Sequence, residues 1–143
     1  MTKVEQSVLI NQTAEGIFAY ISDFRNDPKW QVGIVDAKPH PDGPATVGTQ
    51  VTTLRRFIGQ RIESTAQVTE LEPNKRMALK SISGPFPFSA QITLESVERT
   101  TKVIFNVEIE PKGVFKLAEG MVAGSMKKDL EGSLANLKNQ MES

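Results

Sequence analysis

The stretch VFKLAEGMVAGSMKKDLEGSLANLKNQM, residues 114–141, carries the most informative pattern in the chain. Its apolar residues recur every three or four positions, which predicts one long amphipathic helix with a single apolar stripe. At about 1.5 Å per residue, such a helix spans roughly 40 Å. We therefore expect it to pack on a broad apolar face. The stripe consists of Phe115, Ala118, Val122, Met126, Leu130, Leu134, Leu137 and Met141.

The sequence before this helix alternates between apolar and polar residues, as half-buried strands do. A first strand is predicted over 4–10, then a short helix that begins after Asn11-Gln12-Thr13 and a second helical turn near Trp30. Residues 39–48 are predicted to form a loop. The order of strand, short helices, six strands and long helix predicts an α+β fold, with the long helix on an antiparallel sheet. Five of these six strands are assigned ranges, namely 49–58, 61–71, 77–82, 88–94 and 103–109.

Length and composition limit the possible functions. The chain has 143 residues, 38% of them hydrophobic, which predicts a single domain over residues 1–143 with a substantial core. Its 17 basic and 17 acidic residues give a formal net charge of zero, which does not favour nucleic acid as a partner. Cysteine is absent and His40 is the single histidine, so neither thiol chemistry nor a metal site is expected. We expect a cytoplasmic monomer or weak homodimer without a cofactor or an inserted membrane segment.

Short motifs follow one another in a fixed order along the chain. They are Val8–Ile10 before Ile17-Phe18, Ile21-Ser22-Asp23 before Pro28-Lys29-Trp30, Gly43-Pro44 before Val47-Gly48-Thr49, Val68–Pro73 and Leu134–Lys138. In this order, the sequence resembles the START-like, helix-grip superfamily, in its polyketide cyclase/dehydrase and lipid-transport (SRPBCC) branch, over nearly its whole length. The resemblance implies a seven-stranded curved antiparallel sheet wrapped around a long C-terminal helix, with two short helices between strands 1 and 2. It also implies a hydrophobic cavity between sheet and helix.

The predicted hairpin makes Arg55 the most specific candidate for ligand contact. A two-residue turn at Gly59-Gln60 pairs Arg56 with Glu63 as a cross-strand ion pair and leaves Arg55 on the apolar face. A guanidinium there would favour a carboxylate or enolate head group. The alternative is that Arg55 lies near the hairpin tip and extends to water. The apolar face holds Val51, Thr53, Arg55, Phe57, Ile62, Ser64, Ala66 and Val68.

Further candidates come from the long helix and the loops. Gly120 and Gly124 each cost a helix about 1 kcal/mol relative to alanine, and they leave room either for a ligand or for close packing of a strand. Met121 is either a core residue or an adaptable ligand contact. Phe86 is either a lid over the cavity or part of a plain strand connection. Arg55, Tyr20 and Thr53 are the candidates for catalysis. The expected ligand-binding residues are Arg55, Phe57, Val51, Thr53, Ser64, Ala66, Phe88, Phe86, Phe105, Trp30, Met121, Gly120 and Gly124.

Three functions remain open. The favoured one is binding or transport of a small hydrophobic or amphipathic molecule, lipid- or polyketide-like, with apolar burial as the main source of affinity. The second is a polyketide cyclase or aromatase type of enzyme that acts in the same cavity without a metal or nucleotide cofactor. The third is a stress-associated protein-interaction module, for which the sequence identifies no partner. Charged residues such as Lys127-Lys128-Asp129 are expected to form only a solvated surface.

Overall fold

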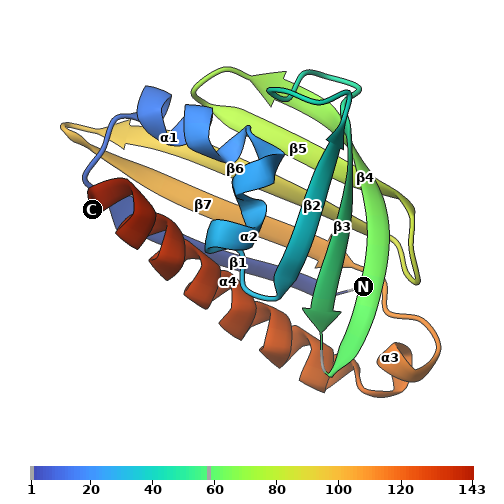
Figure 1. The fold of residues 1–143 in the computed structure, drawn as a ribbon. Helices are drawn as coiled ribbons and strands as arrows, with labels where there is room; N and C mark the ends of the chain where they lie inside the picture. The colour runs from blue at the N-terminus through green and yellow to red at the C-terminus, as the bar shows by residue number, and fades with distance from the viewer. Residues whose placement is uncertain (1, 58) are drawn as a thin grey trace.

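The computed structural model describes residues 2–57 and 59–143, without the side chains of residues 114 and 115. It contains a seven-stranded antiparallel sheet in the order β1-β7-β6-β5-β4-β3-β2, with helices on one side (Figure 1). The first strand therefore lies beside the last, and the others follow as a meander. The strands are β1 (Thr2–Ile10), β2 (Ile34–His40), β3 (Gln50–Phe57), β4 (Gln60–Glu72), β5 (Arg76–Ser83), β6 (Phe88–Val97) and β7 (Thr100–Ile109). The helices are α1 (Ala14–Ile21), η1 (Phe24–Asn26), α2 (Asp27–Trp30), α3 (Val114–Leu117) and α4 (Glu119–Glu142).

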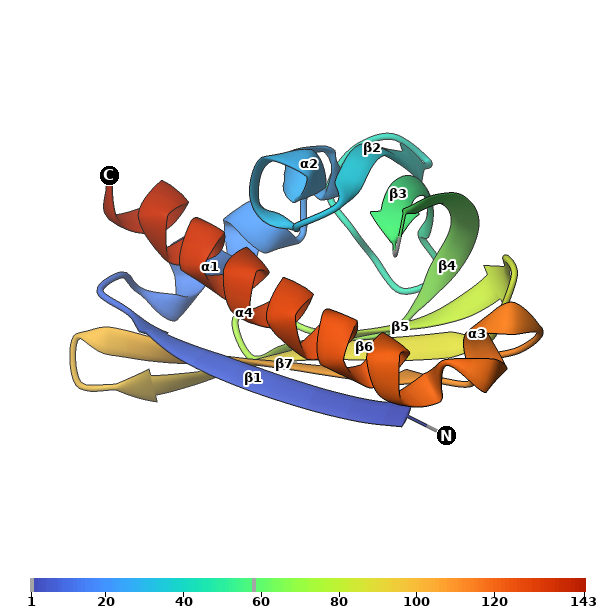
Figure 2. The ribbon, with the colours of Figure 1, turned by 90° about the horizontal axis from the view of Figure 1, so that it is seen from below.

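The sheet curls along β4. This strand is 13 residues long, and its first half pairs with β3 while its second half pairs with β5. Its pairing with β5 changes register between Thr65 and Ala66, and again between Val68 and Glu70. Such bulges bend a strand and increase its twist. Figure 2 shows β2 and β3 standing apart from the plane of β5, β6 and β7, with α4 running across the enclosed side. The predicted curved sheet wrapped around a C-terminal helix is confirmed.

Polar and proline residues fix the short helices between β1 and β2. Thr13 caps α1, because its Oγ1 accepts a hydrogen bond of 3.1 Å from the Gly16 amide. Asp23 caps the 3-10 helix η1 and accepts from the Arg25 amide at 3.1 Å. Pro28 lies in the first turn of α2, where a missing N–H leaves no helical hydrogen bond unmade. The predicted short helices are confirmed, with η1 between them.

Two details of the strand prediction are wrong. β2 occupies residues 34–40, to which no strand was assigned, and its last two residues fall in the predicted loop. Pro39 is tolerated there because β2 is an edge strand. The side chain of His40 is exposed.

The β3–β4 pairing differs from the predicted register by two residues. Arg56 lies opposite Arg61, and Glu63 lies opposite Leu54, so the predicted Arg56–Glu63 ion pair is wrong. A shift of two residues keeps every side chain on its predicted face, because side chains alternate with a period of two. Arg55 thus stays on the inner face. Ile58, the predicted last residue of this strand, lies outside the described residues.

Helix α4 supplies the centre of the core. The long helix predicted over 114–141 is divided at Ala118 into α3 and α4. The side chain of Phe115 lies outside the part of the chain that the structure describes. The predicted stripe is buried along α4 at Val122, Met126, Leu130, Leu134 and Leu137.

The same helix holds the segment that follows α2. The Ser133 hydroxyl accepts a hydrogen bond of 2.8 Å from the Val32 amide, and the Asn136 side chain donates to the Trp30 carbonyl at 3.2 Å. These bonds fix residues 30–32 against α4. Among the described residues, no helix combines the length and apolar character needed to cross a membrane.

Candidate ligand-binding cavity

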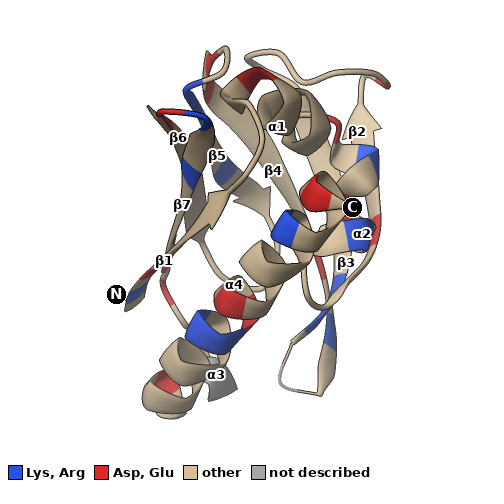
Figure 3. Cartoon of the chain, turned by 90° about the vertical axis from the view of Figure 1, so that its left-hand side faces the viewer, with Lys and Arg blue, Asp and Glu red and all other residues tan. Residues whose placement is uncertain are grey.

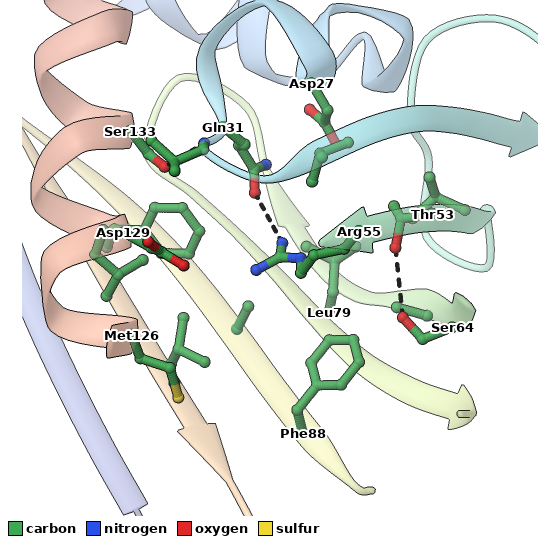
Figure 4. Close-up of a pocket in the computed structure, with 18 of the residues that line it drawn as sticks. Asp27, Gln31, Thr53, Arg55, Ser64, Leu79, Phe88, Met126, Asp129 and Ser133 are labelled. Carbon is green, nitrogen blue, oxygen red and sulfur yellow. Dashed lines mark hydrogen bonds between the residues drawn. The ribbon is translucent and has the colours of Figure 1, made fainter. Parts of the chain in front are cut away.

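A cavity of about 150 Å³ lies between the curled sheet, residues 21–34 and α4 (Figure 4). Most of its wall is apolar and comes from β3 to β7, with Met77, Ile92 and Phe105 among the contributing residues. Met126 and Leu130 of α4 close the wall on the helix side. The alternation of apolar residues along curved strands thus produces one continuous hydrophobic lining.

Most of the predicted ligand-binding residues line this cavity. Thr53 and Ser64 lie opposite one another on β3 and β4, with their hydroxyl oxygens 3.4 Å apart. Trp30 is fully buried, and its ring lies 6.0 Å from that of Phe105. The predicted residues found in the lining are Arg55, Phe57, Val51, Thr53, Ser64, Ala66, Phe88, Phe86, Phe105 and Trp30.

The first turns of α4 do not reach the cavity. A Cβ added at Gly120 or Gly124 would meet nothing within 4 Å, and Met121 is 64% exposed. Close packing of a strand against the two glycines is therefore wrong. Neither glycine is among the residues that line this cavity, and their predicted contact with a ligand stays a prediction. The buried face of α4 in these turns is set by Val122 and Met126, which lie on a different side of the helix.

The 84–87 connection forms one edge of the cavity. Gly84 has a φ of +141°, and a Cβ there would lie 2.9 Å from the Cβ of Ser64 on β4. Only glycine permits both this conformation and this close approach. Pro85 is exposed and also lines the cavity, next to the partly buried Phe86. A lid movement of Phe86 stays a prediction.

Polar side chains gather at one end of the cavity, where α2, β3 and α4 meet. Arg55 points into this end, and one of its Nη atoms lies 3.4 Å from the Gln31 side-chain oxygen (Figure 4). Burial lowers the pKa of Arg55, and the charges of Asp129 and then Asp27 oppose this shift. The alternative in which Arg55 extends to water is therefore wrong. The polar lining residues at this end are Asp27, Gln31, Arg55, Asp129 and Ser133.

Asp27 is the most strongly perturbed of these groups. Burial raises its pKa to about 8 against the opposing effects of Arg55 and of a hydrogen bond with Gln31. Its Oδ1 atom is buried without a hydrogen-bond partner among the described residues, and so is Nε1 of Trp30. Asp27 is thus mostly protonated at neutral pH. A carboxyl group with such a pKa can also give or take a proton near that pH.

Tyr20 is not among the residues that line the cavity. Its hydroxyl is buried and has no hydrogen-bond partner in the part of the chain that the structure describes. Burial and the nearby charge of Asp27 both raise its pKa. Of the three predicted catalytic candidates, only Arg55 and Thr53 lie in the cavity wall, and Asp27 is a buried acidic lining residue that was not predicted from the sequence.

The missed polar residues differ in how visible they are in the sequence. Asp129 was expected to lie on a solvated surface. The acidic and basic residues distributed along α4 do not suggest that any one of them is buried (Figure 3). The spacing of Asp129 does indicate burial, because Asp129 lies seven residues after Val122 and three residues after Met126, on the buried face of the helix. Asp27 precedes a proline, as an ordinary turn residue would, and no local pattern reveals its burial. Within residues 2–57 and 59–143, no cluster of three or more potential acidic or histidine ligands is suited to a metal ion.

Comparison with known proteins gives the family. Residues 1–142 match the family described as polyketide cyclase / dehydrase and lipid transport. The chain belongs to this family. The resemblance to START-like proteins is thereby confirmed, whereas a search among curated proteins finds no match.

Solved structures with the same fold come from several bacteria. A START superfamily protein from Mycobacterium smegmatis is 19% identical, with a TM-score of 0.80 over 99% of this chain and 98% of that chain. A protein from Thermus thermophilus is 14% identical, with a TM-score of 0.85 over 98% and 97%. The Aha1 dimer from Colwellia psychrerythraea is 22% identical, with a TM-score of 0.70 over 99% and 97%. At these identities, the similarity shows the helix-grip fold.

Proposed function

We propose that the protein binds a small hydrophobic or amphipathic molecule in the cavity between its sheet and α4. The observation that supports this function is a partly open cavity with a mostly apolar wall and charged side chains gathered at one end. Burial of apolar ligand surface contributes roughly 25 cal/mol per Å². The few polar groups then fix the orientation of the ligand.

The size of the cavity suggests the first probes. An engineered apolar cavity of ~150 Å³ binds benzene, so one aromatic ring fits a space of this size. A longer lipid- or polyketide-like molecule would extend past Pro85 at the edge of the cavity. A single-ring compound therefore tests the interior alone.

Titration with p-xylene, followed through the backbone amide signals in NMR spectra, tests this function. We expect saturable shifts at lining residues such as Met77 and Ile92. The variant Ala90→Leu fills the cavity and should weaken binding by at least about tenfold, which corresponds to ~1.4 kcal/mol. Gln91→Leu is the matched control, because its side chain lies on the opposite face of β6. Shifts that do not saturate, or equal affinity in Ala90→Leu, would contradict the proposal.

A further inference from the structure

The polar end of the cavity places one cation before two carboxyl groups. Arg55 from β3 points toward Asp129 of α4, and Asp27 of α2 lies on the neighbouring wall (Figure 4). Among the described residues, neither carboxyl group comes within ion-pair distance of the Arg55 guanidinium, although both act on it electrostatically. Arg55 and Asp129 both line the cavity, so a ligand group can approach the two side chains from it.

The charge at this end determines which ligand group fits. Asp27 is mostly protonated at neutral pH. Burial also raises the pKa of Asp129, and the charges of Arg55 and Lys128 oppose this shift. Of the two carboxyl groups, Asp129 has the larger electrostatic effect on Arg55, so it is the main counter-charge at this end. An anionic head group would be attracted by Arg55 but repelled by Asp129. A cationic head group would be attracted by Asp129 but repelled by Arg55. A hydroxyl group satisfies both, because its oxygen accepts from the guanidinium while its hydrogen is donated to the carboxylate.

We propose that the polar end recognises a neutral hydroxyl group of the ligand, an alcohol or a phenol, placed between Arg55 and Asp129. This inference rests on the proposed function and names the class of molecule that the cavity takes. It replaces the carboxylate or enolate head group expected from the sequence, where Asp129 was not assigned to the cavity.

Three probes of the same shape separate the possibilities: p-xylene, 4-methylphenol and 4-methylbenzoate. They are titrated into the full chain at about pH 6.5, below the pKa of about 8 for Asp27. We expect 4-methylphenol to bind at least about tenfold more tightly than 4-methylbenzoate, because repulsion by Asp129 offsets the attraction of Arg55. This comparison uses the unaltered protein and does not depend on the folding of any variant.

The variant Asp129→Asn tests the cause of the preference. Removal of the balancing charge leaves Arg55 unopposed, so 4-methylbenzoate should gain at least about tenfold relative to 4-methylphenol. Glu131→Gln removes an exposed charge from the same helix and should leave the ratio within about twofold of its original value.

The outcomes distinguish this inference from the proposed function. If p-xylene binds in the cavity but 4-methylbenzoate matches or exceeds 4-methylphenol, the hydroxyl assignment is wrong and the proposed function stands. A ratio unchanged by Asp129→Asn also overturns the assignment. If none of the three probes binds, the proposed function itself fails.

Discussion

Gly120 and Gly132 lie in the same helix but have opposite surroundings. A Cβ at Gly120 would meet nothing within 4 Å, whereas a Cβ at Gly132 would lie 3.0 Å from a side-chain methyl of Val32. The first glycine lowers the stability of α4 without a packing benefit. The second allows the helix to approach the segment that carries Gln31 into the cavity.

Replacement of Gly120 by alanine should therefore raise the free energy of unfolding by about 0.5–1 kcal/mol, since alanine loses less backbone entropy in a helix. Urea denaturation followed by circular dichroism measures the change. Gly132→Ala serves as the contrasting variant and should gain less stability than Gly120→Ala, because the Val32 side chain must move to admit the added Cβ. A destabilised Gly120→Ala would show that this face of α4 has a packing partner.

At the scale of elements, the hydrogen bond between α4 and residues 30–32 positions one wall of the cavity. Ser133→Ala leaves the Val32 amide without its partner and should cost about 1–3 kcal/mol. Ser125→Ala, in the same helix, removes no hydrogen bond that the structure shows and should change stability by less than about 0.5 kcal/mol. Thermal unfolding of both variants provides the measurement. Equal effects would mean that the Ser133 bond contributes nothing beyond helix propensity.

The sequence predicts those elements whose side chains repeat with a clear period. The stripe of α4 and the inner face of β3 and β4 follow from such periods, and with them most of the cavity lining. The β3–β4 register does not follow, because a glycine such as Gly59, with a φ of +74°, suits more than one position of a two-residue turn. Asp27 and Gln31 line the cavity because tertiary packing places their segment of the chain there. No local sequence pattern predicts that placement.

At the scale of the whole molecule, Asp27 makes folding stability dependent on pH. Its pKa in the folded protein, about 8, exceeds its ordinary value of 3.8. Between these values the unfolded chain releases a proton that the folded protein retains, so the free energy of unfolding falls as pH rises from about 4 to about 8. Arg55 and Gln31 oppose the raised pKa, whereas Asp23 adds to it, and burial outweighs them all. The charge of Asp27 in turn raises the pKa of Tyr20.

The variant Asp27→Asn should remove this dependence. Relative to the unaltered protein, it should gain stability by several kcal/mol as pH rises through that range. Chemical denaturation at a series of pH values measures the difference, and Asp36→Asn, at an exposed position, is the control. Parallel pH profiles for Asp27→Asn and the unaltered protein would mean that Asp27 is ionised in the folded state.

The N-terminal strand β1 lies against elements from the C-terminal part of the described chain. Thr2 pairs with Ile109, and the Asn11 amide donates to the Glu142 carboxylate at 2.8 Å. During translation, β1 is therefore synthesised long before β7, the strand with which it pairs, and α4 follows both. The inner faces of the strands lack the helix that covers them until α4 has been added, so the cavity wall is complete only after that step.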